Sequence, residues 1–298
     1  QKAAQSADDA FPIAEETMPE EGTALTDKTF DFYLQTLPTP SRAAMEACQH
    51  RLDNLAKPID SLGHLEHIAV ALAGILDDER PGLDLARTLL VFAAEERTPE
   101  EKRRTAAFAQ HAEAEVTLAH LRKDRPLTEA FDFGRAVGEG IAFSVPLVGV
   151  ALSDGASYAP GEKAAALRTA LLKEDGALRY DPTEFLAHVG APLQAEVSAL
   201  LGAIIAAAHN NALVVLDDEA TEIVARYAKA LAPALSPYLL HTQPNLLRLG
   251  ITAAGGAVAC LGFKIIDAAL HILNDMKTFA ETRVSIADDG PGKTRQEK

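Results

Sequence analysis

Apolar positions along the chain follow two different periods. Between the loops, apolar residues recur every three or four positions over long stretches, which is typical of amphipathic helices. Short uninterrupted apolar runs, which are typical of buried strands, occur at Leu89–Ala93, Leu147–Leu152, Leu213–Leu216 and Tyr238–Leu240. Because helices and strands alternate, the pattern predicts an α/β fold: a three-layer α/β/α, Rossmann-like domain with a mainly parallel sheet.

The predicted helices begin at recognisable start signals. Ser41 precedes a helical spacing that continues to Leu55. The run Thr98-Pro99-Glu100-Glu101 supplies an N-cap, a proline at the first helical position and a capping-box glutamate, and the helix it opens is predicted to reach about Leu121. Gly134 and Gly138 are expected to allow close helix packing. Further helices are predicted at 61–75, 128–143, 162–173, from 181 onward, and at 193–208, 219–231 and 257–281.

The chain divides into four predicted parts. Residues 1–27 are acidic and nearly free of aromatic residues, so we expect a disordered or loosely docked arm. Residues 28–80 form a helical N-terminal segment, and residues 81–285 form the α/β domain. The last helix is expected to pack with the N-terminal helices, and residues 286–298 are expected to be a flexible tail.

Composition narrows the class of protein. The chain has 298 residues, 28 Lys+Arg against 43 Asp+Glu, and 48% hydrophobic residues, which is the balance of a globular domain. The net charge of −15 argues against nucleic acid or an anionic membrane as partner. The longest uncharged run, 249–263, is shorter than the roughly 20 apolar residues that cross a bilayer. With two cysteines and no visible signal peptide, we expect a cytoplasmic protein.

Few residues form a recognisable chemical motif. His64 and His67 share a helix face but lack a third ligand, so no metal site is predicted. The phosphate-loop, dinucleotide and serine-hydrolase glycine motifs are absent from the sequence. Asp217 and Asp218 end a predicted strand, where they would hold a ribose hydroxyl or a metal, or cap the next helix. Lys163 lies near a predicted helix start and is either a phosphate ligand or a surface lysine.

Four segments, in the same order, resemble one family. Arg51–Glu66 reads R-L-D-N-L-A-K-P-I-D-S-L-G-H-L-E, similar to the R-L-D-x-L-x-K-P-x-G-S-L-G-x-L-E signature of the nicotinate-nucleotide:dimethylbenzimidazole phosphoribosyltransferases. Asp181–Gly190 resembles D-P-x-E-x-L-A-x-V-G. The helix and strand that end in Val214–Asp217 resemble A-A-A…V-V-L-D-G, and Ile266–Phe279 resembles L-D-A-A…L-x-E-M-x-T-F. The resemblance covers about residues 30–285.

The resemblance implies a function in cobamide lower-ligand activation. Such enzymes displace nicotinate from nicotinate mononucleotide with an aromatic base, need no cofactor and work as dimers. Four retained positions become candidate substrate-binding residues: Gly149, Lys163, Asp217 and His241. The N-terminal signature lies near the dimer interface in this family. The resemblance therefore implies that four of its residues are candidates for contact with a partner subunit: Lys57, Ser61, Gly63 and Glu66. Helix capping is the alternative role for these last residues.

The resemblance breaks at the loops that carry the chemistry. The family's proposed general base is the glutamate of G-E-G-T-G-A, and counting back from Asp267 its position falls on Gly255. The strand-end D-H-G-V…Y-P is replaced by Glu95–Pro99. Framework is kept and site loops diverge, so we predict a non-catalytic subunit that forms a homo- or heterodimer, with an intact paralog favoured as partner. The alternatives are a transferase with a displaced base such as Asp217, and a regulatory protein that binds a nucleotide or base without turnover.

Overall fold

The computed structural model describes residues 13–14, 30–123, 125–181, 184–190, 193–242, 249–253 and 255–282. The chain forms two compact units: unit 1 contains residues up to Pro38 and Ala86–Phe263, and unit 2 contains Thr39–Leu85 and the chain from Lys264 onward. Of the predicted arm at 1–27 only Ile13–Ala14 is described, and the predicted tail at 286–298 lies outside the described residues.

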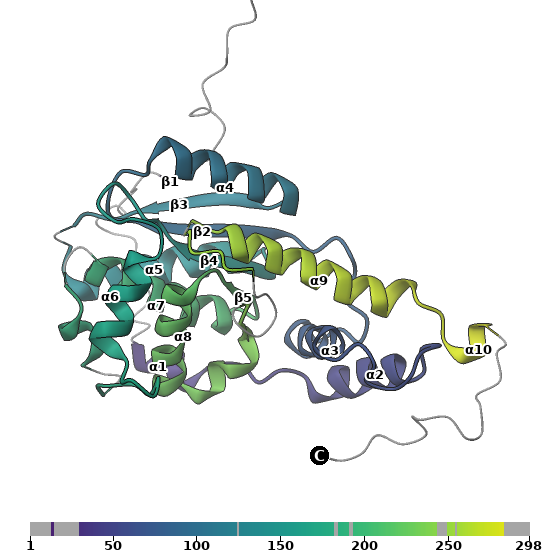
Figure 1. Ribbon diagram of the computed structural model, residues 1–298. Helices are drawn as coiled ribbons and strands as arrows, with labels where there is room; N and C mark the ends of the chain where they lie inside the picture. The colour runs from purple at the N-terminus through teal and green to yellow at the C-terminus, as the bar shows by residue number, and fades with distance from the viewer. Residues whose placement is uncertain are drawn as a thin grey trace, which may run out of the picture. The chain divides into compact units, whose positions relative to one another are not determined.

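Unit 1 is built around one parallel sheet (Figure 1). Thr88 pairs with Glu115 on one side and with Val148 on the other, so its strand, β2 (Arg87–Ala93), is central. The predicted α/β fold with a mainly parallel sheet is confirmed. In spatial order the strands are β1 (Ile13–Ala14), β3 (Glu115–His120), β2 (Arg87–Ala93), β4 (Leu147–Leu152), β5 (Leu213–Leu216) and β6 (Leu239–Leu240).

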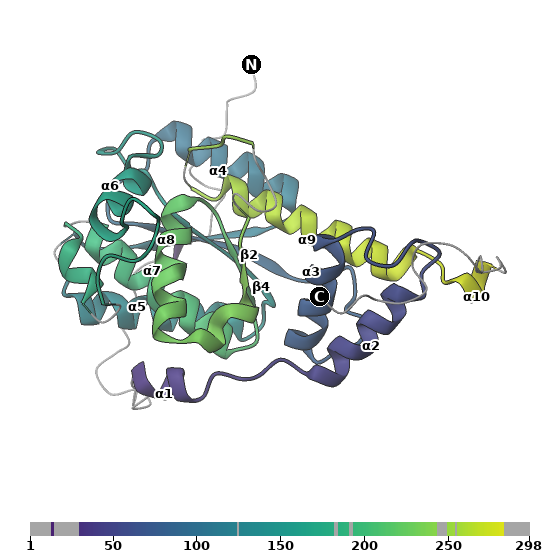
Figure 2. The same ribbon diagram turned by 60° about the horizontal axis from the view of Figure 1, so that its bottom comes forward.

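The central strands of this sheet are buried throughout their length, because helices cover both of its faces. One face is covered by α4 (Pro99–Ala112) and the first turns of α9 (Ala257–Asp275), as Figures 1 and 2 show. The opposite face is covered by α5 (Leu127–Ala142), α7 (Leu193–His209) and α8 (Glu219–Leu231). The remaining elements of unit 1 are α1 (Phe30–Gln35), α6 (Glu162–Leu171), η2 (Phe185–His188) and η3 (Pro233–Tyr238).

Helices α5 and α7 touch backbone to backbone. A Cβ added at Gly134 would lie 1.8 Å from the carbonyl oxygen of Ala199, and one at Gly138 would lie 2.8 Å from the Cα of Ala203. The predicted close packing at these two glycines is therefore confirmed, and the partner surface is the alanine-rich face of α7.

The helix predicted from Thr98 to about Leu121 is too long. It ends at Ala112, and Glu113 takes a left-handed conformation with φ +56° that turns the chain into β3. Strand β3 was missed because polar residues interrupt its apolar ones. Likewise, in the described part of the chain the helix predicted from 181 onward is only the short turn η2.

Unit 2 consists of helices from both ends of the chain. It contains α2 (Arg42–Asp53), α3 (His64–Leu76), the later turns of α9 and α10 (Phe279–Thr282). Arg51 Nε donates to the carbonyl of Leu273 at 2.9 Å, and Asn274 Nδ2 donates to that of Pro81 at 2.8 Å. The N-terminal helices are thereby tied to the last long helix, which stops at Asp275 and not at the predicted 281.

One helix in the described part of the chain, α9, is long and apolar enough to cross a membrane by length and composition alone. Of the most apolar 18-residue stretch of α9, 56% is buried inside the structure. The core helix of a globular protein has the same properties, so α9 gives only weak evidence for a membrane span.

Candidate functional site

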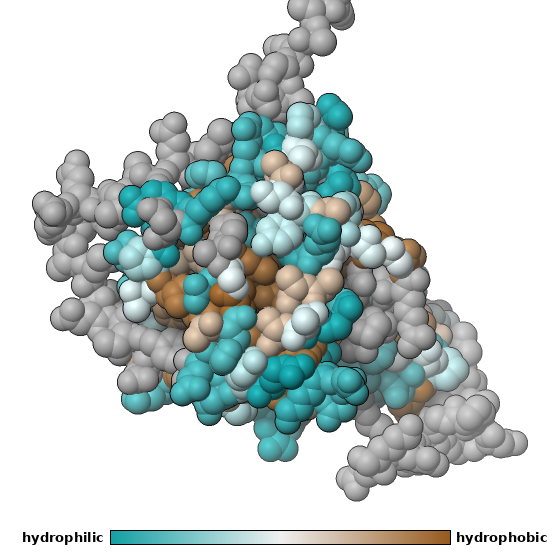
Figure 3. Space-filling view, turned by 60° about the vertical axis from the view of Figure 1, so that its left-hand side comes forward, coloured by the Kyte–Doolittle hydropathy of each residue, from teal (hydrophilic) through white to brown (hydrophobic). Residues whose placement is uncertain are grey.

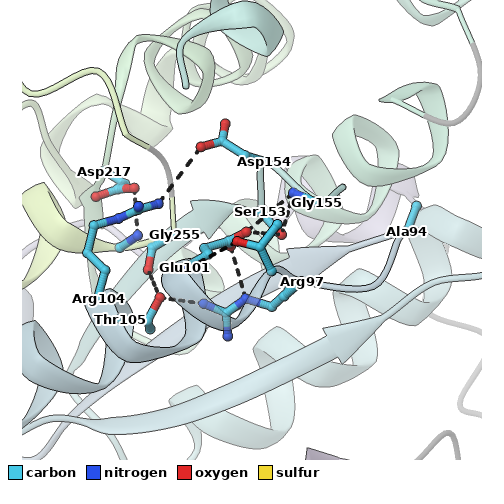
Figure 4. A network of polar contacts seen from close by, with 12 residues as sticks. Ala94, Arg97, Glu101, Arg104, Thr105, Ser153, Asp154, Gly155, Asp217 and Gly255 are labelled. Carbon is cyan, nitrogen blue, oxygen red and sulfur yellow. Dashed lines mark hydrogen bonds and ion pairs between the residues drawn. The ribbon is translucent and has the colours of Figure 1, made fainter. Parts of the chain in front are cut away.

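A network of polar side chains lies where the central strands of unit 1 end (Figure 4). In an open parallel sheet the carboxyl ends of the strands border the usual ligand crevice. Here the segments that leave β2 and β4 are joined to the start of α4 and to the loop before α9. We therefore take this edge as the candidate site.

Glu101 is the centre of the network. Thr98 Oγ1 accepts from the backbone N–H of Glu101 at 3.2 Å, which confirms the predicted N-cap of α4. The predicted capping-box role of the Glu101 side chain is wrong, because its carboxylate turns to the neighbouring loops. It accepts from Arg97 Nε at 2.9 Å, from Ser153 Oγ at 3.0 Å and from the N–H of Gly155 at 3.3 Å. Glu101 is only 2% exposed.

The position that the resemblance assigns to a glutamate, Gly255, faces this carboxylate. A Cβ at Gly255 would lie 3.0 Å from Glu101 Oε1 and 3.1 Å from Thr105 Oγ1. Thr105 Oγ1 also donates to the carbonyl of Gly255 at 2.8 Å, and the φ of Gly255 is +92°. The backbone conformation and the crowding both favour glycine here.

Asp217, a candidate substrate-binding residue, is fully buried at the end of β5. Its carboxylate accepts from the backbone N–H groups of Gly256, Val258 and Ala259 at 2.8, 2.8 and 3.0 Å, so it caps the start of α9. Burial nevertheless raises the pKa of Asp217 to about 6. Asp217 thus caps α9 and not the next helix along the chain, and its binding role stays a prediction.

Asp218 caps the next helix. Its Oδ1 accepts from the N–H of Thr221 at 3.0 Å, and Thr221 Oγ1 accepts from the N–H of Asp218 at 3.0 Å, which completes a capping box on α8. Burial, together with the negative charge of Asp217, raises the pKa of Asp218 to about 7. Two adjacent carboxylates therefore hold two helix starts at one strand end.

Lys163 is buried, so the surface-lysine interpretation is wrong. It lies in the first turn of α6 and its Nζ is bonded to Glu196 Oε2, with side chains 3% and 1% exposed. The other oxygen of Glu196 accepts from the N–H of Ala94 at 2.7 Å, and Lys163 Nζ lies 5.2 Å from the ring centroid of Tyr158. Burial raises the pKa of Glu196. The pair connects α6, α7 and the end of β2, and the phosphate role of Lys163 stays a prediction.

The two other candidate substrate-binding residues lie in different surroundings. His241 follows β6, with its Nδ1 2.5 Å from Glu222 Oε2 on α8. Gly149 lies in the middle of β4, where a Cβ would lie 2.9 Å from the ring of Phe263. Gly149 thus permits the close approach of α9, and His241 is at the carboxyl edge of the sheet.

Several polar residues of the site were not singled out from the sequence. The carboxylate of Glu95 accepts hydrogen bonds from Lys123 Nζ at 2.6 Å and from the N–H of Ser157 at 3.0 Å. The bond from Lys123 lowers the pKa of Glu95. Arg97 and Glu196 are also buried. A signal for Glu196 exists, because it is the only charged residue in the apolar run 193–208.

The signature residues at 57–66 form a separate cluster in unit 2. Lys57 Nζ donates to Glu66 Oε1 at 2.8 Å, and the N–H of Leu62 donates to the same oxygen at 2.9 Å. Gly63, with φ +50°, precedes α3, which therefore begins at His64 and not at Ser61. Ser61 is exposed. Their role in contact with a partner stays a prediction.

The described residues offer little for metal or thiol chemistry. Among them, no group of three or more His, Cys, Asp or Glu is placed to hold a metal ion. Both cysteines are buried and free. Burial raises the pKa of Cys48 to about 11 and that of Cys260 to about 12, which makes both thiols poor nucleophiles.

Comparison with known proteins defines the class. A family model described as phosphoribosyltransferase matches residues 37–128 and 149–284. The nicotinate-nucleotide–dimethylbenzimidazole phosphoribosyltransferase of Desulforudis audaxviator (strain MP104C) is 26% identical, over 83% of this chain and 95% of that protein. The protein of that name from Cereibacter sphaeroides (strain ATCC 17025 / ATH 2.4.3) is 27% identical, over 86% of this chain and 96% of its own length.

A solved structure has the same fold. The crystal structure of the nicotinate-nucleotide-dimethylbenzimidazole phosphoribosyltransferase from Thermus thermophilus superimposes with a TM-score of 0.66 at 21% identity, over 83% of this chain and all of that one. The fold and the family match together define an α/β protein of the phosphoribosyltransferase class. The chain belongs to this phosphoribosyltransferase family, which confirms the resemblance seen in the sequence.

Proposed function

We propose that this chain takes part in activation of the lower-ligand base of a cobamide, as the non-catalytic subunit of a cytoplasmic two-chain phosphoribosyltransferase. An intact paralog would transfer phosphoribose from nicotinate mononucleotide to an aromatic base, and this chain would complete the dimer. The reaction type is carried over from the names of its relatives. The division of labour between the two chains is argued from the site.

The observation that carries the proposal is that five buried carboxylates of the site already accept hydrogen bonds from within the chain. Proton removal from the attacking base requires an acceptor within hydrogen-bond reach of that proton. In the described site, carboxylate oxygens accept bonds from a neighbouring side chain or backbone amide in Glu95, Glu101, Glu196, Asp217 and Asp218. Gly255 contributes no side chain.

Asp217 is a poor substitute for the missing base. It is 0% exposed and accepts three backbone N–H groups, so moving it toward a substrate would uncap α9. This geometry disfavours the alternative of an independently active transferase that uses Asp217.

Exposed apolar surface supports association with another protein. Phe143 is 86% exposed and Leu249 is 57% exposed. Figure 3 shows apolar residues gathered in the middle of one face, with hydrophilic residues around them. Surface of this kind is typical of protein–protein contacts.

A turnover assay tests the proposal. The purified chain is incubated with nicotinate mononucleotide and a panel of benzimidazole and phenolic acceptors, alone and with an intact paralog from the same organism. We expect riboside phosphate only from the mixture, at a rate above that of the paralog alone.

Each other outcome points to a different function. Product from this chain alone would overturn the proposal and establish an independent transferase. If the chain neither forms product nor changes the rate of the paralog, yet binds nicotinate mononucleotide in calorimetry, the regulatory alternative replaces the proposal.

A further inference from the structure

The donors around Glu101 form an anion-binding arrangement. Arg97 Nε donates to one carboxylate oxygen, while Ser153 Oγ and the N–H of Gly155 donate to the other. These donors come from the segments that follow β2 and β4, and the carboxylate comes from α4. We infer that unit 1 contains a carboxylate-binding cradle at its strand-end edge, and that the chain's own Glu101 occupies it.

The donors are held in place by contacts that do not involve Glu101. Arg97 is bonded to Thr105, whose hydroxyl donates to the carbonyl of Gly255. The backbone N–H of Ser153 donates to the carbonyl of Phe92 at 2.8 Å, and Ser153 Oγ accepts from the N–H of Gly155 at 3.0 Å. Removal of the Glu101 carboxylate therefore leaves a guanidinium, a hydroxyl and an amide N–H that still converge on one place.

The chemistry of these donors specifies the ligand class. A guanidinium with a hydroxyl and a backbone N–H is a typical set for an oxyanion. The two oxygens of Glu101 divide the donors between them, as a planar carboxylate does. The cradle lies beside Gly255, where a Cβ would lie 3.0 Å from Glu101 Oε1, so Glu101 and a side chain at position 255 compete for the same space.

The inference goes beyond the proposed function and does not depend on a partner subunit. In this chain an internal carboxylate, that of Glu101, takes the donors that a ligand would use. The ligand class that fits is a small organic carboxylate.

Chemical rescue tests the cradle. The variant Glu101→Ala removes the internal carboxylate, and its thermal unfolding is followed in sodium formate and in sodium chloride at equal ionic strength. We expect formate at about 0.1 M to raise the Tm of Glu101→Ala by about 3–6 °C relative to chloride, because a ligand bound only to the folded state stabilises it. The wild type, with its cradle filled, should show no difference between the two salts.

Two matched variants show whether the rescue comes from these donors. Adding Ser153→Ala to Glu101→Ala removes one donor and should reduce the formate shift by at least half. Glu219→Ala removes an exposed carboxylate that pairs with Arg168 and should show no formate shift. Inorganic phosphate serves as a third salt, and a larger shift in phosphate than in formate would overturn the assignment to a carboxylate.

A second variant keeps the test informative if Glu101→Ala does not fold. Glu101→Gln keeps the volume of the side chain but loses its charge, so it should lower the Tm by about 5–10 °C with no rescue by formate. Wild-type stability of Glu101→Gln, or an equal response of Glu101→Ala to formate and chloride, would overturn the inference.

Discussion

The two adjacent carboxylates after β5 make a prediction at the scale of single residues. The pKa values of Asp217 and Asp218, about 6 and about 7, lie above the ordinary value near 3.9 that both have in an unfolded chain. The folded state therefore binds protons more tightly, and its stability falls as the pH rises from about 4 to about 7. Asp218→Asn keeps the N-cap but removes one charge. The fall in unfolding free energy between pH 5 and pH 8 should therefore be smaller in this variant than in the wild type, by on the order of 1–2 kcal/mol.

Urea unfolding at several pH values measures this effect, and Glu95 offers the control. Its pKa is lowered by the bond from Lys123, so it stays ionised between pH 5 and 8. Glu95→Gln should leave the slope in this range unchanged. Identical slopes for Asp218→Asn and the wild type would show that the pair does not titrate as argued.

The buried pair of Lys163 and Glu196 carries a second prediction at this scale. Among the described residues, Lys163→Met would leave the buried Glu196 carboxylate with the N–H of Ala94 as its one donor. Loss of one partner of a buried pair costs about 3–5 kcal/mol of unfolding free energy. The double variant Lys163→Met, Glu196→Gln should recover a large part of that loss in urea unfolding, because no buried charge remains unpaired. Additive losses would contradict this coupling.

The contact of α5 with α7 gives a prediction at the scale of elements. Gly134→Ala would place a Cβ 1.8 Å from the carbonyl oxygen of Ala199, so the helices must separate. We expect a loss of about 2–4 kcal/mol in unfolding free energy. Gly140 lies on the same helix with nothing within 4 Å of its Cβ position. Gly140→Ala should therefore stabilise by about 0.5–1 kcal/mol, and chemical denaturation of both variants distinguishes packing from helix propensity.

Elements with a clear hydrophobic period could be predicted from the sequence, and elements determined by tertiary contact could not. Helix α8 was predicted at 219–231 and observed at Glu219–Leu231, because its apolar stripe and its cap coincide. Strand β3 was missed because Glu115, Thr117 and His120 interrupt its apolar residues, and its strand conformation depends on pairing with β2. The C-terminal end of α4 was also misplaced, because it depends on a single residue, Glu113, that adopts a φ of +56°.

At the scale of the whole molecule, the sequence located the strand-end edge of the site but not its network. Asp217 was identified from its place after a predicted strand, and Lys163 from its place near a predicted helix start. The partners Glu196 and Glu101 lie 33 and 52 residues from the groups they bond, Lys163 and Ser153. Such pairings arise only when the sheet brings distant segments together, so periodicity and local spacing carry no information about them.

Pairing with a second subunit makes the last prediction, which concerns the assembled enzyme. Ser61 is exposed on unit 2 and does not cap α3, whose N-cap is Gly63 without a side-chain bond. Ser61→Ala should therefore leave the Tm of this chain unchanged. If the 57–66 signature contacts a partner, the same variant should lower the activity of the two-chain mixture roughly tenfold, as loss of about 1.4 kcal/mol of association would. Ser236→Ala, at an exposed serine of unit 1, is the matched control and should change neither quantity. Full activity of the Ser61→Ala mixture would contradict a partner contact at this serine. The 57–66 signature would then have only a local structural role, through the contact of Lys57 with Glu66.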